Sequence, residues 1–140
     1  MCDMTRLLVF SLVLCSAQAY AAKWVQLADD DDSSFYIDID SVRSISPYLV
    51  GSSSTDRYLS VFSRIDFNDG ARLSSGEAYT HTIQYNYINC DMGSYFVKSF
   101  RMYNNREVVA SDDYTIEDES EFKIAYPTTP PDDIIKTICV

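Results

Sequence analysis

The sequence has few of the residues on which catalysis and metal binding usually depend. Its 140 residues include one histidine, four cysteines and four glycines. It contains no glycine-rich phosphate loop and no serine flanked by the glycines of a nucleophile elbow. A metal site built on histidine or cysteine would need several histidines, or cysteines beyond those in a disulfide. These shortages argue against an enzyme, and we expect a protein that needs no cofactor.

Positive charge is also scarce. Eleven Lys and Arg residues face 21 Asp and Glu residues, which gives a net charge of −10 at pH 7. An acidic surface repels nucleic acid and anionic membranes, so we expect neither as a partner. The acidic residues gather at four places: 29–32, 112–113, 117–121 and 132–133. None has the alternating oxygens and turn glycine of a calcium loop, so solvated loops are favoured over a calcium site.

The chain has one long hydrophobic run, and it lies near the start. Residues 7–15 are almost wholly apolar, Arg6 precedes them, and small residues dominate 16–21. This pattern predicts a secretory signal peptide over residues 1–21 and an exported domain over 22–140. The run is too short to span a bilayer. Leu14, directly before Cys15, argues against lipid attachment at that cysteine.

The number of cysteines in the exported domain follows from this prediction. Loss of the signal peptide leaves only Cys90 and Cys139, and two cysteines in an oxidising compartment form one disulfide. The loop closed between them contributes about 4 kcal/mol in the chain-entropy description of disulfides.

Hydrophobic periodicity predicts a chain built mainly from strands. Alternation of apolar and polar residues, or runs of β-formers, predict strands at 23–27, 35–40, 57–65, 79–89, 95–103 and 106–110. Asn68-Asp69-Gly70 predicts a tight turn, and Asn104-Asn105 predicts a two-residue hairpin loop because asparagine tolerates positive φ.

The end of the chain has helical periodicity. Over residues 131–139, a proline and two aspartates suit the first turn. Ile134, Ile135, Ile138 and Cys139 share one side. A helix of this length is unstable alone in water, so we expect the disulfide to hold it against the sheet.

These pieces, taken in order, resemble the surface-adhesin protein E-like family of Gram-negative bacteria. The residues that carry the resemblance are Trp24-Val25, 36–42, Cys90, 103–111, 124–129 and 134–139. The resemblance covers about Ala22 to Val140. It implies an antiparallel sheet with a disulfide-tethered C-terminal helix and a periplasmic or surface location. The named member of that family binds host extracellular-matrix and plasma proteins, whereas most of its relatives have no known role.

Two groups of side chains could act in acid–base catalysis. His81 lies in the middle of a predicted strand and could act as a general base, but a lone strand histidine is usually a polar surface residue. Asp38 and Asp40 alternate on one strand face and could act as paired acids, but the solvated side of a half-buried strand is favoured.

The eleven tyrosines are the more informative feature. Strict alternation puts Ile83, Tyr85 and Tyr87 on the side of their strand opposite to Cys90. Tyr95, Val97 and Tyr103 would extend this side from the next strand. The candidate partner-binding residues are therefore Tyr85, Tyr87, Tyr95 and Tyr103. The alternative, a bulge at Asn89, would reverse the alternation and make the tyrosines core residues. Both interpretations stay open at this point.

The sequence therefore predicts an α+β domain, with an antiparallel β-sheet of about six strands and one short C-terminal helix tethered by a disulfide. We expect an exported, non-enzymatic binding protein in the periplasm or on the outer cell surface. Its partner would be a host matrix or plasma protein, or a second copy of itself. The alternative is a periplasmic structural or envelope-maintenance protein with no host ligand.

Overall fold

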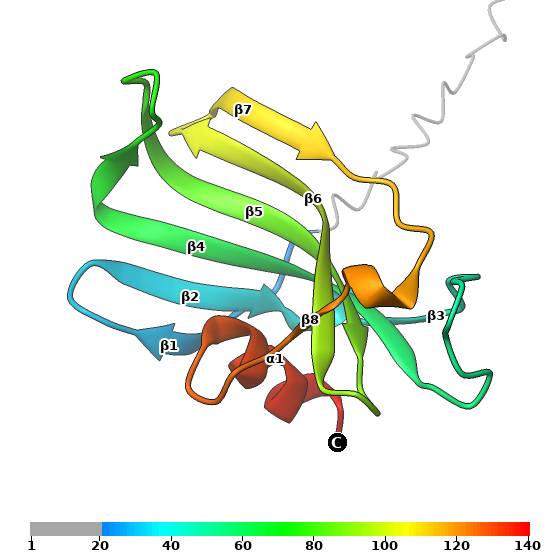
Figure 1. Cartoon of the computed structure of the whole chain (residues 1–140). Coiled ribbons are helices and arrows are strands. Elements are labelled where there is room, and N and C mark those ends of the chain that lie inside the picture. Colours follow the sequence, from blue (N-terminus) through cyan, green and yellow to red (C-terminus); the bar gives the residue numbers. More distant parts are fainter. Residues whose placement is uncertain (1–20) are drawn as a thin grey trace, which may run out of the picture.

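A computed structural model of the chain describes residues 21–140 (Figure 1). Residues 1–20 lie outside the described part, and with them nearly all of the predicted signal peptide and Cys15. No helix within residues 21–140 has the length and the hydropathy that a bilayer crossing requires.

A single antiparallel sheet forms most of the molecule. Six strands follow one another as neighbours: β1 (Trp24–Asp29), β2 (Ser33–Asp38), β4 (Tyr58–Arg72), β5 (Ala78–Asn89), β6 (Ser94–Asn104) and β7 (Glu107–Asp113). Two short strands join the sheet beside this path: β3 (Arg43–Ile45) pairs with β4, and β8 (Lys123–Ile124) pairs with β6. All of these pairs are antiparallel.

The six predicted strands all occur, but the fold class needs a correction. The described residues contain eight strands and one α-helix, so the domain is mostly β rather than α+β. β3 and β8 could not be predicted, because strands of two or three residues are too short to show a period of two.

The predicted turn at Asn68–Gly70 is wrong. β4 continues through it to Arg72, with a register shift against β5 between Asp66 and Ala71. The chain reverses at Leu73–Glu77 instead, where the Leu73 N–H donates to the Glu77 carbonyl at 2.8 Å. Gly70 does adopt a positive φ of 70°. A bulge and a hairpin turn both use such a glycine, so the local signal does not separate them.

The hairpin between β6 and β7 lies one residue further along than predicted. Its two-residue loop is Asn105–Arg106, and Asn105 has φ 56°. Asparagine tolerates this conformation better than most residues, which is why the prediction was nearly right.

Helix α1 (Pro130–Ile138) covers one face of the sheet, which we call the helix face (Figure 1). Ile134 and Ile138 are buried in a main core with Phe35, Ile37, Leu59, Val61 and Ile88. The predicted disulfide is confirmed: Cys90, directly after β5, is bonded to Cys139 at the end of α1, with 5.5 Å between the Cα atoms.

A second, smaller core lies on the other face of the sheet, at one end. Leu49, Tyr58 and Phe122 are buried there, and Ile45, Tyr87, Phe96 and Ile116 pack around them. The 3-10 helix η2 (Glu119–Glu121) leads directly into Phe122.

Buried polar groups hold this second core in place. The Asn89 side-chain amide is fully buried and donates to Asp56 Oδ2 at 3.0 Å and Glu119 Oε1 at 2.9 Å. The Tyr58 hydroxyl donates to the other oxygen of Glu119. One carboxylate therefore joins η2 to both β4 and β5.

Candidate functional site: the aromatic face

A β-bulge in β6 determines which side chains share a face of the sheet. Tyr85 pairs with Ser99 and Asn86 pairs with Val97, so Lys98 is an extra residue in β6. An extra residue reverses the alternation of side chains beyond it. Val97 therefore lies on the helix face, whereas Tyr103, on the other side of the bulge, lies on the opposite face.

The bulge separates the four candidate tyrosines into two groups. Tyr85, Tyr87 and Tyr103 lie on the face opposite to α1. Tyr95 packs against the main core on the helix face. The expectation that Tyr95 and Val97 extend the surface of Tyr85 is therefore corrected, because strict alternation does not hold across Lys98. β5 itself pairs with β4 without a register shift from His81 to Asn89, so the alternative bulge at Asn89 does not occur.

Three of the rings on this face form a series across β4 and β5. The Phe62 and Tyr85 rings stack with centroids 4.7 Å apart, and the Tyr85 and Tyr87 rings meet edge to face at 5.5 Å. Cross-strand pairing adds Tyr36, beside Arg64, to the same face. We call this surface the aromatic face; its members are Tyr36, Phe62, His81, Tyr85, Tyr87 and Tyr103.

Exposure changes along the aromatic face. Tyr87 packs against the second core, and burial raises the pKa of its hydroxyl. Phe62 is 40% exposed, a large fraction for a phenylalanine ring. The Tyr87 end of the series is therefore packed against the interior, whereas the stacked Phe62–Tyr85 pair is in contact with solvent.

Sequence reasoning missed Phe62 and Tyr36. A usable signal for Phe62 was present: Leu59, Val61 and Ile65 define the inward side of its strand, so Phe62 is an apolar residue on the outward side.

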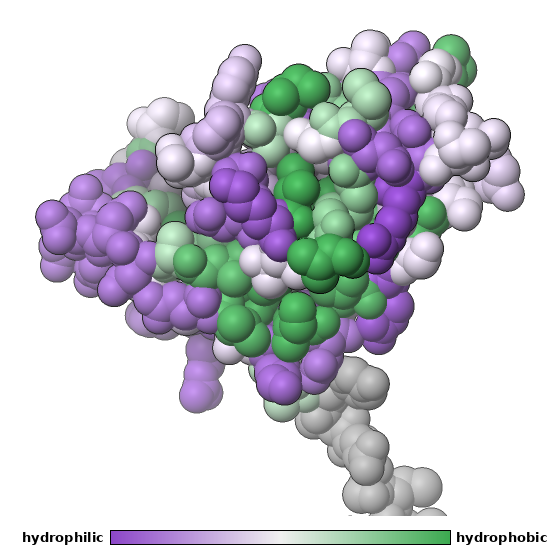
Figure 2. Space-filling model, turned by 90° about the horizontal axis from the view of Figure 1, so that it is seen from below, coloured by the Kyte–Doolittle hydropathy of each residue, from purple (hydrophilic) through white to green (hydrophobic). Residues whose placement is uncertain are grey.

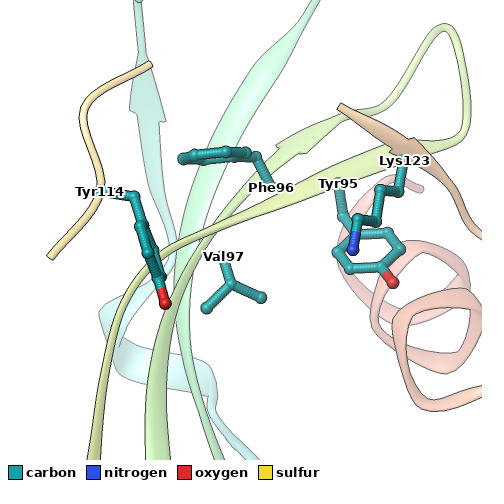
Figure 3. A pocket seen from close by; sticks show the side chains of 5 residues that line it. All are labelled: Tyr95, Phe96, Val97, Tyr114 and Lys123. Atoms are coloured by element: carbon teal, nitrogen blue, oxygen red, sulfur yellow. The ribbon is translucent and has the colours of Figure 1, made fainter. Parts of the chain in front are cut away.

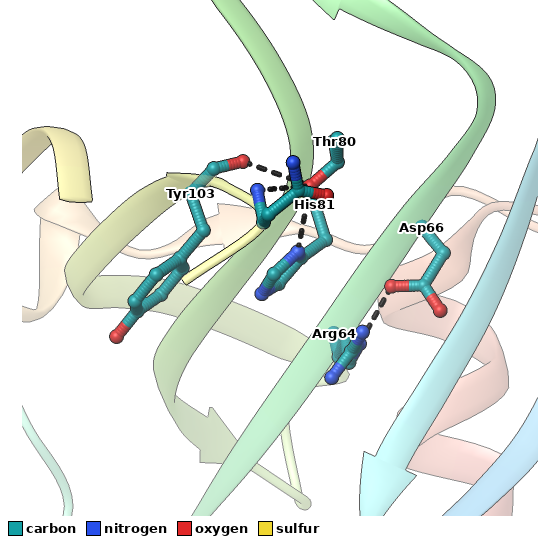
Figure 4. Close-up of polar contacts among 6 residues, drawn as sticks. Arg64, Asp66, Thr80, His81 and Tyr103 are labelled. Atoms are coloured by element: carbon teal, nitrogen blue, oxygen red, sulfur yellow. Dashed lines mark hydrogen bonds and ion pairs between the residues drawn. The ribbon is translucent and has the colours of Figure 1, made fainter. Parts of the chain in front are cut away.

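His81 lies on the aromatic face beside Tyr103, its cross-strand partner (Figure 4). Its ring stacks on Tyr103 with centroids 4.8 Å apart and planes 4° from parallel. It is half-buried rather than a free surface residue. Burial and then the nearby Arg64 guanidinium lower its pKa from 6.5, because both disfavour the charged imidazolium.

A hydroxyl fixes the orientation of the His81 ring. Thr80 Oγ1 accepts the Asn105 N–H at 3.0 Å and donates to the Tyr103 carbonyl at 3.1 Å (Figure 4). The same oxygen lies 3.1 Å from His81 Nδ1, in a hydrogen bond whose donor is set by the tautomer of the ring.

Asp38 and Asp40 do not form a pair of catalytic acids. β2 ends at Asp38, and Asp40 is an exposed residue of the 3-10 helix η1 (Ile39–Ser41). The Asp38 carboxylate caps η1 by accepting the Asp40 N–H at 3.2 Å, and it also accepts the Lys23 N–H at 3.1 Å. β2 ends two residues before Asp40, so the strand alternation that the sequence suggested does not extend over the pair.

Other acidic residues also serve as local caps. Asp30 Oδ1 accepts the N–H groups of Asp32 and Ser33, both at 2.9 Å, and these bonds hold the pKa of its carboxyl low. Asp118 accepts the Ser120 N–H in the same way and caps η2, with the same effect on its pKa. Among residues 21–140, no group of three or more His, Cys, Asp or Glu side chains is arranged to hold a metal ion.

A disulfide-closed antiparallel sheet with a helix on one face and stacked rings on the other defines a small, mostly-β domain. The family model of surface-adhesin protein E matches residues 24–140, so the chain belongs to the surface-adhesin protein E family. Searches of the curated proteins and of the solved structures gave no significant match. The family suggests an exported adhesin that binds protein partners without catalysis.

Proposed function

We propose that this protein is a surface adhesin that binds a host matrix or plasma protein through its aromatic face. The observation that carries the proposal is the stacked Phe62–Tyr85 pair on the face of the sheet opposite to α1, with Phe62 40% exposed. Membership of the surface-adhesin protein E family supports the same conclusion.

The composition of the aromatic face suits protein recognition. Aromatic residues and arginine are enriched at protein interfaces, and rigid rings lose little conformational entropy on binding. Arg101 pairs across the sheet with Ile83, which adds an exposed guanidinium beside the rings. The Phe62 ring is already held against Tyr85, so binding would not have to order it.

Charge favours a basic partner. The chain has a net charge of −10, and the acidic turn between β1 and β2 lies at one end of the sheet (Figure 1). Such a field accelerates association with a basic surface and weakens as salt increases. We therefore propose a partner with a basic patch and expect binding to fall between low salt and physiological salt.

A binding assay on immobilised matrix and plasma proteins tests the proposal. Phe62→Ala and Tyr85→Ala should each reduce affinity about tenfold or more, because central aromatic residues dominate interface energies. Tyr126→Ala is the matched control, since Tyr126 is 72% exposed and lies outside the aromatic face. Equal losses in all three variants, or none, would contradict the proposed surface.

A second experiment separates this function from the alternative of a periplasmic structural or envelope-maintenance protein. Intact cells are treated with protease, and the protein is followed in outer-surface and periplasmic fractions. An adhesin must be degraded on intact cells. Complete protection in the periplasm would favour the structural role.

A further inference from the structure

The sheet has a break in its β6 edge. β7 ends at Asp113 and β8 begins at Lys123, so neither strand pairs with Phe96 or Val97. Between them the chain leaves the sheet, passes through η2 and buries Phe122 in the second core. Phe122 therefore both stabilises the second core and keeps the intervening chain away from this stretch of edge.

The break opens into a pocket of about 330 Å³ (Figure 3). Its lining residues are Tyr95, Phe96, Val97, Tyr114 and Lys123. Figure 3 shows Phe96 and Val97 on opposite sides of β6, so the pocket wraps around the strand edge. A cavity of about 230 Å³ shares Tyr95 and Val97 and continues along the helix face towards Pro130. The volume suits a small ligand, and most of the wall is apolar.

The surroundings of the pocket are apolar as well. Figure 2 shows hydrophobic residues gathered on the side of the molecule seen from below, the side on which α1 lies in Figure 1. Directly after Lys123, Ile124 is 54% exposed. An alkyl chain bound here would therefore be removed from water by the surrounding apolar surface as well as by the pocket itself.

Lys123 is the charged group of this pocket, and its ammonium is not neutralised. Lys98 pairs with Asp113 at 2.6 Å and Lys136 pairs with Asp132 at 2.7 Å. Lys123 has no carboxylate within 4.0 Å among the residues that the structure describes. In a chain with a net charge of −10, a cation without an acidic partner beside apolar walls favours an anionic group on the ligand.

The ends of the break limit the shape of the ligand. At one end Tyr95 is paired with Lys123 of β8, and at the other the Tyr114 N–H donates to the Lys98 carbonyl at 2.8 Å. A partner strand running along the edge would collide with one of these connections. A short, flexible molecule meets no such barrier.

We propose that this pocket binds a medium-chain fatty acid, with the alkyl chain among Tyr95, Val97 and Tyr114 and the carboxylate on Lys123 Nζ. The site is separate from the aromatic face and does not depend on the proposed adhesin function. The apolar wall supplies most of the affinity, and the ammonium selects a carboxylate over an uncharged head group.

Decanoate below its micelle concentration is the probe, with decanol and octanoate as comparisons, and binding is measured by calorimetry. We expect one decanoate per chain, about tenfold tighter binding than octanoate and about fivefold tighter binding than decanol. Lys123→Met, which keeps the apolar stem, should remove the preference over decanol. Lys136→Met is the matched control and should keep it.

Two further variants test the apolar wall. Val97→Trp should fill the pocket and abolish binding of decanoate and decanol together. Tyr114→Ala removes an exposed part of the wall and should weaken both ligands even if Val97→Trp does not fold. No saturable decanoate binding, or an unchanged preference in Lys123→Met, would overturn the proposal. Stronger binding of a leucine-terminated peptide acid than of decanoate would overturn the fatty-acid assignment.

Discussion

The two faces of the sheet are built from different side chains, although the same strands supply both. On the helix face, Ile37, Val61 and Ile88 are fully buried, and the disulfide closes the helix over them. On the aromatic face, Tyr85 is half-buried and Phe62 is 40% exposed. Branched aliphatic residues fill a closed core well, whereas stacked rings keep a defined shape while partly in water. The main core therefore lies on one face, whereas the other face, apart from the second core at one end, presents aromatic rings to solvent.

Removal of the disulfide should produce the largest effect and test the helix face directly. Cys139→Ser should lower the free energy of unfolding by up to about 4 kcal/mol, because the 49-residue separation no longer restricts the unfolded chain. Urea unfolding gives the value, and hydrogen exchange should show α1 opening first. Thiol labelling of unreduced protein provides the control. Ready alkylation of both wild-type cysteines would contradict the predicted bond.

Matched isoleucine truncations on the two sides of β5 should separate the faces. Ile88→Ala should cost about 3 kcal/mol, because it leaves a cavity in a site with no solvent exposure. Ile83→Ala, on the aromatic face and only half-buried, should cost about 1 kcal/mol. Urea midpoints of the two variants give the comparison. Equal losses would mean that the aromatic face is as closed as the helix face.

Removal of a polar contact under the second core should have an intermediate effect on the free energy of unfolding. Tyr58→Phe removes the hydroxyl that donates to Glu119 and should lower stability by about 1–2 kcal/mol, since hydrogen bonds to charged groups are stronger than neutral ones. Tyr126→Phe, at an exposed site, should leave stability unchanged. An unchanged denaturation midpoint for Tyr58→Phe would show that water replaces this contact without loss.

His81 should give the smallest effect, visible only as a pH dependence. Because its pKa is lowered in the folded protein, the unfolded chain binds a proton more readily below pH 6.5. The His81 contribution to stability is therefore complete above pH 6.5 and is lost as pH falls towards the lowered pKa. Thermal unfolding of His81→Gln between pH 5 and 8 should lack this component. An identical pH profile in the variant would assign the dependence to other groups.

Local sequence patterns were sufficient for most of the secondary structure. The six main strands, α1 and the Cys90–Cys139 bond were all predictable, because period-two alternation, proline and aspartate in the first helical turn, and cysteine number act over short distances. The family resemblance was also readable from short motifs and is confirmed by the family match.

The candidate site was only partly predictable. Tyr85 and Tyr87 lie on the face that alternation gave them, and Tyr103 joins them, but Tyr95 does not. The residues around Lys98 give no sequence signal for a bulge. The extra residue is defined by the register with β5 rather than by its own chemistry. Phe62 became part of the site only when pairing placed it against Tyr85.

The sequence by itself therefore determined the six main strands, a C-terminal helix to within one residue of its observed bounds, and which cysteines pair. These outcomes depend on hydrophobic period, capping chemistry and composition, all of which are local. Tertiary structure alone decided the allocation of side chains to faces, the second core around Phe122 and the break in the β6 edge beside Lys123. Each of these depends on contacts between residues distant in the chain, where a one-residue change of register moves a side chain to the other side of the sheet.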